Sequence, residues 1–357
     1  MPVFKFFPVQ SKRFLKQATL LPILISCLMG LNSCQSQSTV ETAAINPDLP
    51  GEGIKVKAAY IGQEGKFVEE IVSLALAELG YQMAEFKQLE PPLIHTAISQ
   101  GDLDYFSGYW HILFEDFFQA SGGEDQLERV GTLVPNVLQG YQIDKKTAEK
   151  YNITNLAQLK DPEIAKLFDT DNDGKANLTG CNPGWGCEAV IEHHLKVYEL
   201  EETVEHDQGS YEALIANTVA RYRQGQPVLY YTWTPYWLGV ELKPGEDVIW
   251  LEVPFTDLPG EQSKITAEGT SVDGKNLGFA VDKIQILANQ QFIDANPAAK
   301  RLFEVIEIPL ADINTQNQRI KQGENTPEEI RRHAEEWIKN HQQEFDSWIE
   351  TAQQAAL

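Results

Sequence analysis

The sequence predicts an α/β protein of two lobes, and three observations support this fold class. Stretches of alternating polar and apolar residues, typical of strands, are interleaved with stretches of helical periodicity. The same alternation begins again after Gly140. The chain has 357 residues, which is about the length of two ordinary domains. We therefore expect mainly parallel sheet flanked by helices in each lobe, a ligand in the cleft between the lobes, and a hinge that closes it.

The first half of the chain supplies the clearest elements. Alternation over 54–60 predicts a half-buried strand that opens the first lobe. Apolar residues at helical spacing over 67–79 predict a helix that ends at Gly80. A second helix is expected over 93–99 and a second strand over 105–110.

The second half repeats this pattern and ends in helices. The expected helices cover 157–168, 188–200, 211–223, 297–306 and 327–354, the last with at most one break, and the expected strands cover 228–233, 248–253 and about 277–287. The segment 256–275 is rich in Gly, Pro and polar residues and predicts a long loop.

The first 33 residues have the pattern of an export signal. A basic stretch ending at Lys16 leads into an apolar run over 18–31 that is short for a membrane span. The run ends in Leu-Asn-Ser-Cys at 31–34, which resembles the lipobox of bacterial lipoproteins, with Asn32 as a departure. We expect a lipoprotein signal peptide at 1–33, lipidation of Cys34, a tether over 34–50 and a periplasmic or extracytoplasmic chain anchored to a membrane. Ordinary secretion with cleavage nearby is the alternative.

The charge balance excludes one class of partner. The chain has 29 Lys and Arg against 52 Asp and Glu, a net charge of −23 at neutral pH. A surface this negative repels phosphate backbones, so we expect no nucleic-acid partner. Solubility is the main consequence, with a modest, salt-sensitive attraction for cationic solutes as a second one.

Two of the four cysteines remain once Cys27 has left with the signal and Cys34 has taken the lipid. Cys181 and Cys187 lie close together in an exported chain and predict a disulfide. Because the closed loop is short, the bridge contributes only about 2 kcal/mol through the unfolded state. We expect it to stiffen its own loop. A free catalytic thiol is the alternative, which an oxidising compartment disfavours.

The search for an enzyme finds no nucleophile elbow, phosphate-binding glycine loop or dinucleotide fingerprint. His193 and His194 are adjacent and would point to different sides of a helix, which is poor geometry for a metal. Paired acids such as Glu115 and Asp116 are expected at the surface. We therefore expect no enzyme activity and no required cofactor.

One acidic run resembles the first half of a calcium loop. Asp169, Asp171 and Asp173 alternate, and Gly174 follows at the sixth position. Gly180 falls at the twelfth position, where such loops carry a bidentate glutamate. Two interpretations stay open, a structural calcium site and an acidic turn.

Three tryptophans are candidates for a binding site. Trp110 ends a predicted strand, Trp185 lies between the two cysteines, and Trp233 lies in the aromatic run 230–237. Indole faces suit a quaternary ammonium, which has no N–H to donate, and three such contacts supply roughly 6 kcal/mol. Micromolar binding needs about 8 kcal/mol. A carboxylate on the backbone N–H groups of Gly186 and Cys187, at the start of a predicted helix, would add to this.

The chain resembles the periplasmic glycine betaine-binding proteins of osmoprotective ABC importers. The matching segments are 157–170, 178–188 with Leu-Thr-Gly-Cys-Asn-Pro-Gly-Trp-Gly-Cys-Glu, 230–237 and 296–299. The resemblance extends from about Pro50 to the C-terminal helix. It implies a type II-like, Venus-flytrap periplasmic-binding-protein fold. Lobe I would comprise 51–138 and 276–357, and lobe II would comprise 139–275.

The resemblance also implies the site. By position, the ligand's ammonium would lie in a cage of Trp110 from one lobe and Trp185 and Trp233 from the other, with its carboxylate on the main chain of Gly186 and Cys187. Relatives carry Thr-Pro-Leu-His after the first cage tryptophan and use that histidine for the carboxylate. Here positions 111–114 are His-Ile-Leu-Phe, so Phe114 replaces the histidine. His111 is the candidate substitute.

The resemblance therefore implies a substrate-binding lipoprotein for glycine betaine or proline betaine, with an ABC permease and ATPase as partners. The first alternative is a binder of choline or another quaternary ammonium, which Phe114 and the additional aromatic Tyr109 favour. An extracytoplasmic carbohydrate-active enzyme and an interaction module without a ligand are the alternatives from other classes.

Overall fold

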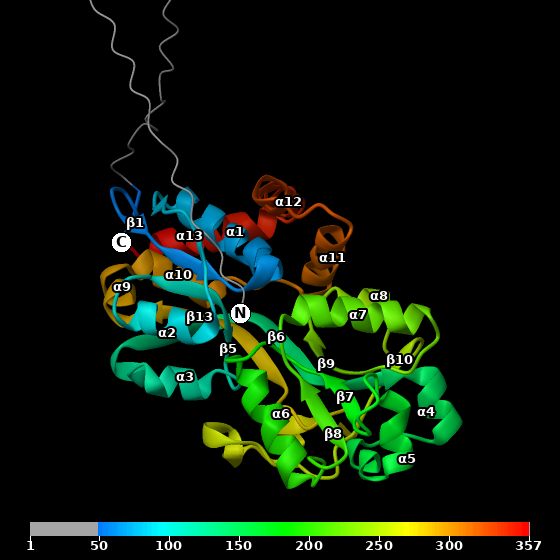
Figure 1. Cartoon of the computed structure of the whole chain (residues 1–357). Helices are drawn as coiled ribbons and strands as arrows, with labels where there is room; N and C mark the ends of the chain where they lie inside the picture. The colour runs from blue at the N-terminus through cyan, green and yellow to red at the C-terminus, as the bar shows by residue number, and fades with distance from the viewer. Residues whose placement is uncertain (1–48, 357) are drawn as a thin grey trace, which may run out of the picture. The chain divides into compact units, whose positions relative to one another are not determined.

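The computed structural model describes residues 49–356, which lie in one compact unit (Figure 1). The predicted signal peptide at 1–33, the lipidation site Cys34 and nearly all of the tether over 34–50 lie outside the described residues. Among residues 49–356 no helix combines the length and the apolar character needed to cross a membrane.

A mixed sheet forms the centre of the described part, with the strand order β4-β2-β5-β13-β6-β9-β7-β8 and with β10 paired to β6. Its strands are β2 (Ala58–Tyr60), β4 (Lys87–Gln88), β5 (Tyr105–Trp110), β6 (Leu127–Asp144), β7 (Ala176–Thr179), β8 (Val204–Asp207), β9 (Leu229–Thr234), β10 (Val248–Trp250) and β13 (Asp282–Asn289). Two small pairs lie apart from it, β1 (Lys55–Val56) with β3 (Gln82–Met83) and β11 (Ser271–Val272) with β12 (Lys275–Asn276). The predicted strands are confirmed, the first of them interrupted at Lys57.

The centre of the sheet is antiparallel, so the prediction of mainly parallel sheet is wrong there. β13 runs antiparallel to both β5 and β6, and β6 runs antiparallel to β9 and β10. Only the outer parts, β4-β2-β5 and β9-β7-β8, are parallel. The local patterns mark strands but not their partners, and β13 enters between β5 and β6 from a distant part of the chain.

The long strand β6 was not predicted, because turn-forming residues interrupt its pattern. Gly131 and Asn136 have positive φ angles of 65° and 56°, and the register against β13 shifts in this region. Both features are typical of β-bulges. β6 pairs with β13 over 127–137 and with β9 over 138–143. The lobe limits 51–138, 139–275 and 276–357 stay predictions.

Of the seven predicted helices, six are present with their ends shifted by five residues or fewer, and five other helices were not predicted. The described part contains thirteen α-helices. They are α1 (Gly62–Glu78), α2 (Pro91–Ser99), α3 (Glu115–Ala120), α4 (Lys145–Tyr151), α5 (Pro162–Ala165), α6 (Gly186–Val197), α7 (Tyr211–Arg223), α8 (Leu238–Glu241), α9 (Gln290–Ala295), α10 (Pro297–Val305), α11 (Leu310–Lys321), α12 (Pro327–Asn340) and α13 (Gln342–Gln354). The helix predicted over 157–168 is instead three short turns, because Pro162 cannot continue a helix from the preceding residue. The predicted loop over 256–275 contains two short 3-10 turns, and its end forms most of the small β11-β12 pair.

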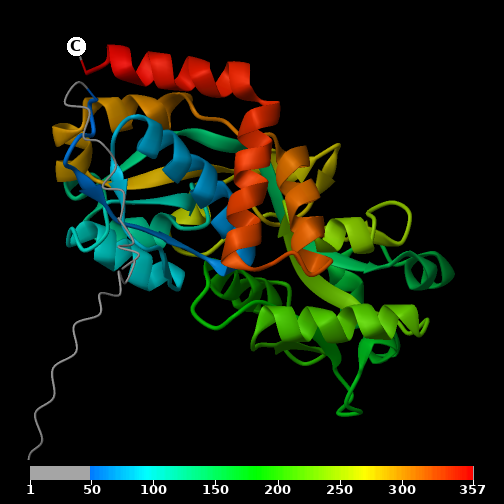
Figure 2. The same ribbon diagram turned by 90° about the horizontal axis from the view of Figure 1, so that it is seen from above.

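The N-terminal and C-terminal segments of the described part pack together. α1 contacts α11 and α12, and α13 lies along α10 (Figure 2). The predicted C-terminal helix is broken once, at His341, and begins with a capping box in which Thr326 and Glu329 bond each other's backbone N–H groups. α11 was not predicted. Ile313 and Asn317 of this helix line a cavity.

Candidate functional site

The three predicted tryptophans meet in one cavity of about 980 Å³, which includes space open to solvent. Trp110, Trp185 and Trp233 all line it, together with Gly186 and Cys187. The structure thus brings five of the six predicted ligand-binding residues together. The first and last of them in the sequence, Trp110 and Trp233, are more than 100 residues apart.

The sheet and one helix end hold the tryptophans. Trp110 is the last residue of β5 and pairs with Ile284 of β13, and Trp233 lies in β9 opposite Gln139 of β6. Trp185 is the N-cap residue of α6. The rings of Trp185 and Trp233 meet edge to face at 5.9 Å and 68°. This arrangement leaves indole faces for a cation.

A layer of three tyrosines packs around Trp233, and one of them, Tyr231, lines the cavity as well. The Trp233 ring centre lies 4.7 Å from that of Tyr211, 4.5 Å from that of Tyr236 and 5.9 Å from that of Tyr231. All three tyrosines are buried. The tyrosine layer therefore restricts the orientation of Trp233, which keeps the indole in place before a ligand arrives.

The disulfide between Cys181 and Cys187 is present, which confirms the predicted bridge. Within its loop Gly184 has a φ of 85°, and its N–H donates to the Glu188 carboxylate at 2.6 Å. A Cβ atom on Gly186 would lie 2.9 Å from the carbonyl oxygen of Leu113, so only glycine fits at this close approach. The loop is therefore held on several sides next to the cavity.

Gly186 and Cys187 are the first two residues of α6, a helix of 12 residues. The N–H groups in the first turn of a helix have no partner within the helix, and they lie at the positive end of its dipole. Both residues line the cavity. This helix end is therefore suited to a carboxylate.

Phe114 lines the cavity, whereas His111 does not. The Phe114 ring is 5 % exposed and packs edge to face against His95 at 5.6 Å. Burial, together with the positive charges of Lys283 and Arg129, lowers the pKa of His111. The structure therefore does not bring the predicted substitute histidine to the ligand.

Tyr109 is also absent from the cavity wall. It is fully buried and packs against His95, Phe114 and Phe118. Successive residues of a strand point to opposite faces, so Tyr109 and Trp110 of β5 cannot both face the cavity.

Two polar residues of the wall were missed at the level of sequence. Glu64 of α1 lines the cavity, and burial raises the pKa of its carboxyl to about 7, with the nearby negative charge of Glu212 adding to the effect. Asn317 of α11 is fully buried, and its side-chain amide has no hydrogen-bond partner among the described residues. Neither residue lies in a motif, so no sequence signal distinguishes them from surface residues.

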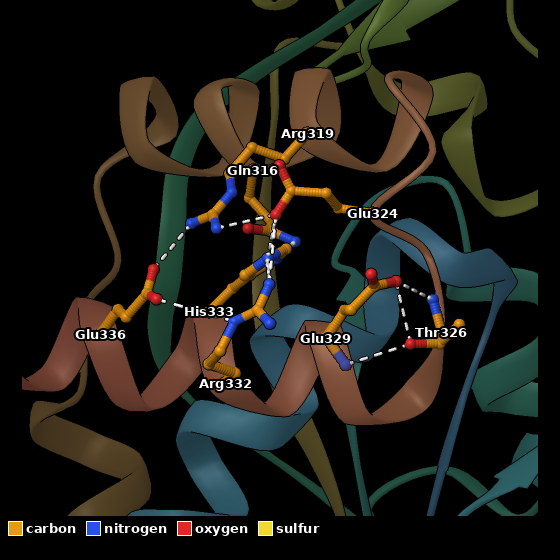
Figure 3. Close-up of polar contacts among 8 residues, drawn as sticks. All are labelled: Gln316, Arg319, Glu324, Thr326, Glu329, Arg332, His333 and Glu336. Carbon is orange, nitrogen blue, oxygen red and sulfur yellow. Dashed lines mark hydrogen bonds and ion pairs between the residues drawn. The ribbon is translucent and has the colours of Figure 1, made fainter.

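A polar network holds α11 in place (Figure 3). Gln316 of α11 donates to His333 of α12 at 2.8 Å, and the opposite nitrogen of His333 lies 2.8 Å from the Glu324 carboxylate. Glu324 also accepts from Arg319 and Arg332. The network fixes α11 against α12 and so keeps Asn317 at the cavity wall.

The acidic run lies away from this cavity. Carboxylate oxygens of Asp169, Asp171 and Asp173 all lie within 4.8 Å of one another, and this is the one such cluster found among the described residues. At the ninth position Asn177 instead bonds Thr170 and Asp207. Calcium binding stays a prediction.

The adjacent histidines do not form a metal site with each other. His193 pairs with Asp257 at 2.6 Å, and buried His194 bonds the Tyr141 hydroxyl at 2.8 Å. Each ring is therefore engaged separately, as the sequence predicted.

Solved structures show which class of protein has this fold. A lactococcal protein, OpuAC in its closed-liganded conformation with glycine betaine, has a TM-score of 0.63 at 18 % identity over 83 % of this chain and 99 % of its own. An ABC-transporter choline binding protein in complex with choline has a TM-score of 0.66 at 16 % identity over 85 % of this chain and 96 % of its own. The fold is that of a two-lobed periplasmic substrate-binding protein, as predicted.

Sequence comparison gives the family. The model of the substrate-binding domain of ABC-type glycine betaine transport systems matches residues 56–340. The glycine betaine-binding periplasmic protein OusX of Dickeya dadantii (strain 3937) is 49 % identical over 313 residues, which cover 87 % of this chain and 93 % of the relative. The chain belongs to this family of transporter substrate-binding domains. Family membership confirms that it is not an enzyme.

Proposed function

We propose that the chain binds glycine betaine or proline betaine through a cage of Trp110, Trp185 and Trp233 and delivers it to an importer for osmoprotection. The observation that carries the proposal is the convergence of three indoles in a cavity whose described lining contains no Lys, Arg or His. Such a wall suits a quaternary ammonium, and its main feature for an anionic group is the start of α6 at Gly186 and Cys187. The names of the relatives agree with this ligand class.

In this mechanism the open cleft captures the ligand, and the lobes close around it. The ammonium lies against the indoles, and the carboxylate accepts hydrogen bonds from the N–H groups of Gly186 and Cys187. A membrane permease then receives the ligand, with transport driven by a cytoplasmic ATPase. The extracytoplasmic location and the lipid anchor at Cys34 belong to this proposal.

Choline is the second candidate, because Phe114 lines the cavity where relatives are expected to carry a histidine. Phe114 removes one donor for a carboxylate and leaves the cage intact. Choline has a hydroxyl in place of the carboxylate, so the absence of this donor does not lower its affinity. A protein of the same fold is an ABC-transporter choline binding protein whose structure was solved in complex with choline.

Calorimetric titration of the unlipidated chain with glycine betaine, choline and glycine, alongside tryptophan fluorescence, tests the proposal. We expect saturable one-to-one binding of glycine betaine with quenched or shifted emission, and no heat from glycine. Tighter choline than betaine binding would support the second candidate. Heat from neither quaternary ammonium would overturn both.

We also propose that Asp169, Asp171 and Asp173 hold a structural calcium ion. Their clustered carboxylates support this, and the engaged Asn177 means that fewer ligands are offered than in a complete loop. A thermal melt with calcium and with a chelator tests it. Equal melting temperatures would leave only an acidic turn.

A further inference from the structure

Glu64 is the one acidic or basic residue among those described as lining the tryptophan cavity. The other lining residues are aromatic, aliphatic, amide, hydroxyl, disulfide or glycine residues. Glu64 also lines an adjoining pocket that shares Trp185 and Trp233 with the cavity. Glu64 therefore lies beside the proposed cage.

The described residues provide no counter-ion for this carboxylate. The next basic residue of α1, Lys66, pairs with Glu70 at 3.2 Å. The interactions that act on the Glu64 carboxyl are burial, its own backbone N–H and the charge of Glu212. Glu64 is partly buried, and a carboxylate withdrawn from water without a positive partner costs free energy or takes up a proton.

The groups that face Glu64 from the surrounding elements add no positive charge. They are Tyr211 and Glu212 of α7, Tyr236 after β9, and Glu90 ahead of α2. Tyr236 is 3 % exposed, and its hydroxyl has no partner among the described residues. Glu90 accepts the indole N–H of Trp185. Glu64 and these neighbouring groups therefore have no cationic partner among the described residues.

We propose that Glu64 is the counter-charge for the ligand's ammonium group and thereby sets the charge preference of the cavity. The inference rests on the proposed function and deepens it. A monocation such as choline gains the whole attraction to Glu64. A zwitterion is attracted to Glu64 at its ammonium, but repulsion between Glu64 and the ligand's own carboxylate cancels part of this attraction. Glu64 therefore favours a net positive ligand over a zwitterion of similar size.

Proton linkage follows from the same arrangement. With no ligand, burial holds the pKa of Glu64 at about 7, so near neutral pH the carboxyl is partly protonated. A bound cation favours the ionised form and lowers that pKa. Binding therefore releases a proton near pH 7, and affinity rises as the pH rises toward and above 7, then levels off.

The test compares the full unlipidated chain with its Glu64→Gln variant, which keeps side-chain size and removes the charge. Choline and glycine betaine are titrated by calorimetry on either side of neutral pH. We expect choline affinity to fall about tenfold above neutral pH, betaine affinity to fall less, and the pH dependence of both to flatten. Glu205→Gln removes an equal charge from an exposed residue of β8 that lines neither the cage cavity nor the adjoining pocket. It is expected to keep the choline-to-betaine ratio.

A measurement on the unmodified chain makes the result independent of the folding of the variant. Binding heats recorded near pH 7 in two buffers of different ionisation enthalpy give the number of protons released. A fractional release that disappears well above neutral pH supports the inference. Binding without proton release, or an unchanged affinity ratio in a folded Glu64→Gln variant, overturns it and leaves the proposed function intact. An unmodified chain that binds neither ligand overturns both.

Discussion

The indole N–H of Trp185 donates a hydrogen bond of 2.6 Å to the carboxylate of Glu90, which precedes it by 95 residues. Glu90 stands directly ahead of α2, and Trp185 caps α6. The bond therefore joins the disulfide loop to the first part of the chain across the adjoining pocket. It also fixes the edge of one indole of the proposed cage.

Replacing Glu90 with alanine should weaken the ligand while leaving the fold intact. The bond is exposed, so its loss costs about 1 kcal/mol or less of stability. Affinity should fall severalfold because Trp185 becomes free to rotate. Glu90→Gln, which keeps an acceptor oxygen, is the matched control. Equal affinities for quaternary ammonium in calorimetric titrations of the two variants would contradict an orienting role.

Trp185→Ala should remove most quaternary-ammonium binding. One desolvated cation–π contact of about 2 kcal/mol corresponds to roughly a 30-fold loss of affinity. The loss of melting temperature should be small, because the side chain is only partly buried and packs at the edge of the hydrophobic core next to the cavity. Trp250→Phe alters an indole outside the cavity lining and should bind normally. Unchanged affinity in a folded Trp185→Ala variant would rule out the cage.

Phe114→His should shift preference toward glycine betaine and away from choline. The new imidazole would lie in the cavity wall and could donate to the ligand's carboxylate. Phe117→His places the same group on a neighbouring ring that packs on Phe114 but does not line the cavity. Competition binding measures the affinity ratio. An equal choline-to-betaine affinity ratio in both variants would show that other groups bind the ligand's carboxylate.

Loss of the Cys181–Cys187 bridge should affect the ligand more than the fold. The closed loop is short, so stability changes by about 2 kcal/mol or less, whereas Trp185 and the start of α6 lose their rigid support. Titration and thermal melting with and without reductant compare the two effects. A large drop in melting temperature with unaltered affinity would contradict loop stiffening.

Glu69 predicts a pH dependence of stability. It is fully buried, accepts the Ser107 hydroxyl at 2.7 Å, and burial raises its pKa to about 7 from 4.5. Between these two values the folded state binds the proton more tightly than the unfolded state. The contribution of Glu69 to stability is therefore present below pH 4.5 and is lost as pH rises to 7, by about 3 kcal/mol.

Denaturant unfolding of Glu69→Gln and of the unmodified chain across this pH range measures the effect. The stability difference between them should move in favour of the variant as pH rises. Glu70→Gln is the control. Glu70 pairs with Lys66 and Arg331, so its replacement should not reproduce the trend seen for Glu69→Gln. A pH-independent difference for Glu69→Gln would show that the carboxyl ionises at its ordinary pKa.

Much of the fold and of the site followed from local pattern. Periodicity located α7 at its observed limits and β5 likewise, because an amphipathic stretch buries the same face wherever it packs. The disulfide loop and the three tryptophans were identified from residue type, spacing and resemblance, and the structure assembles them in one cavity. β6 was not predicted, because the Gly and Asn residues at its bulges are typical of turns and interrupt the strand pattern.

The sequence by itself determined the element types, the disulfide, the family resemblance and the candidate aromatic residues, because each depends on neighbours along the chain. Tertiary structure alone decided the antiparallel centre of the sheet, the separation of His111 from the cavity, and the presence of Glu64 and Asn317 in its wall. These depend on which distant segments pack together, and so does the environment that raises the pKa of a carboxyl group. No local sequence pattern predicts these features, since the residues that each of them contacts lie elsewhere in the chain.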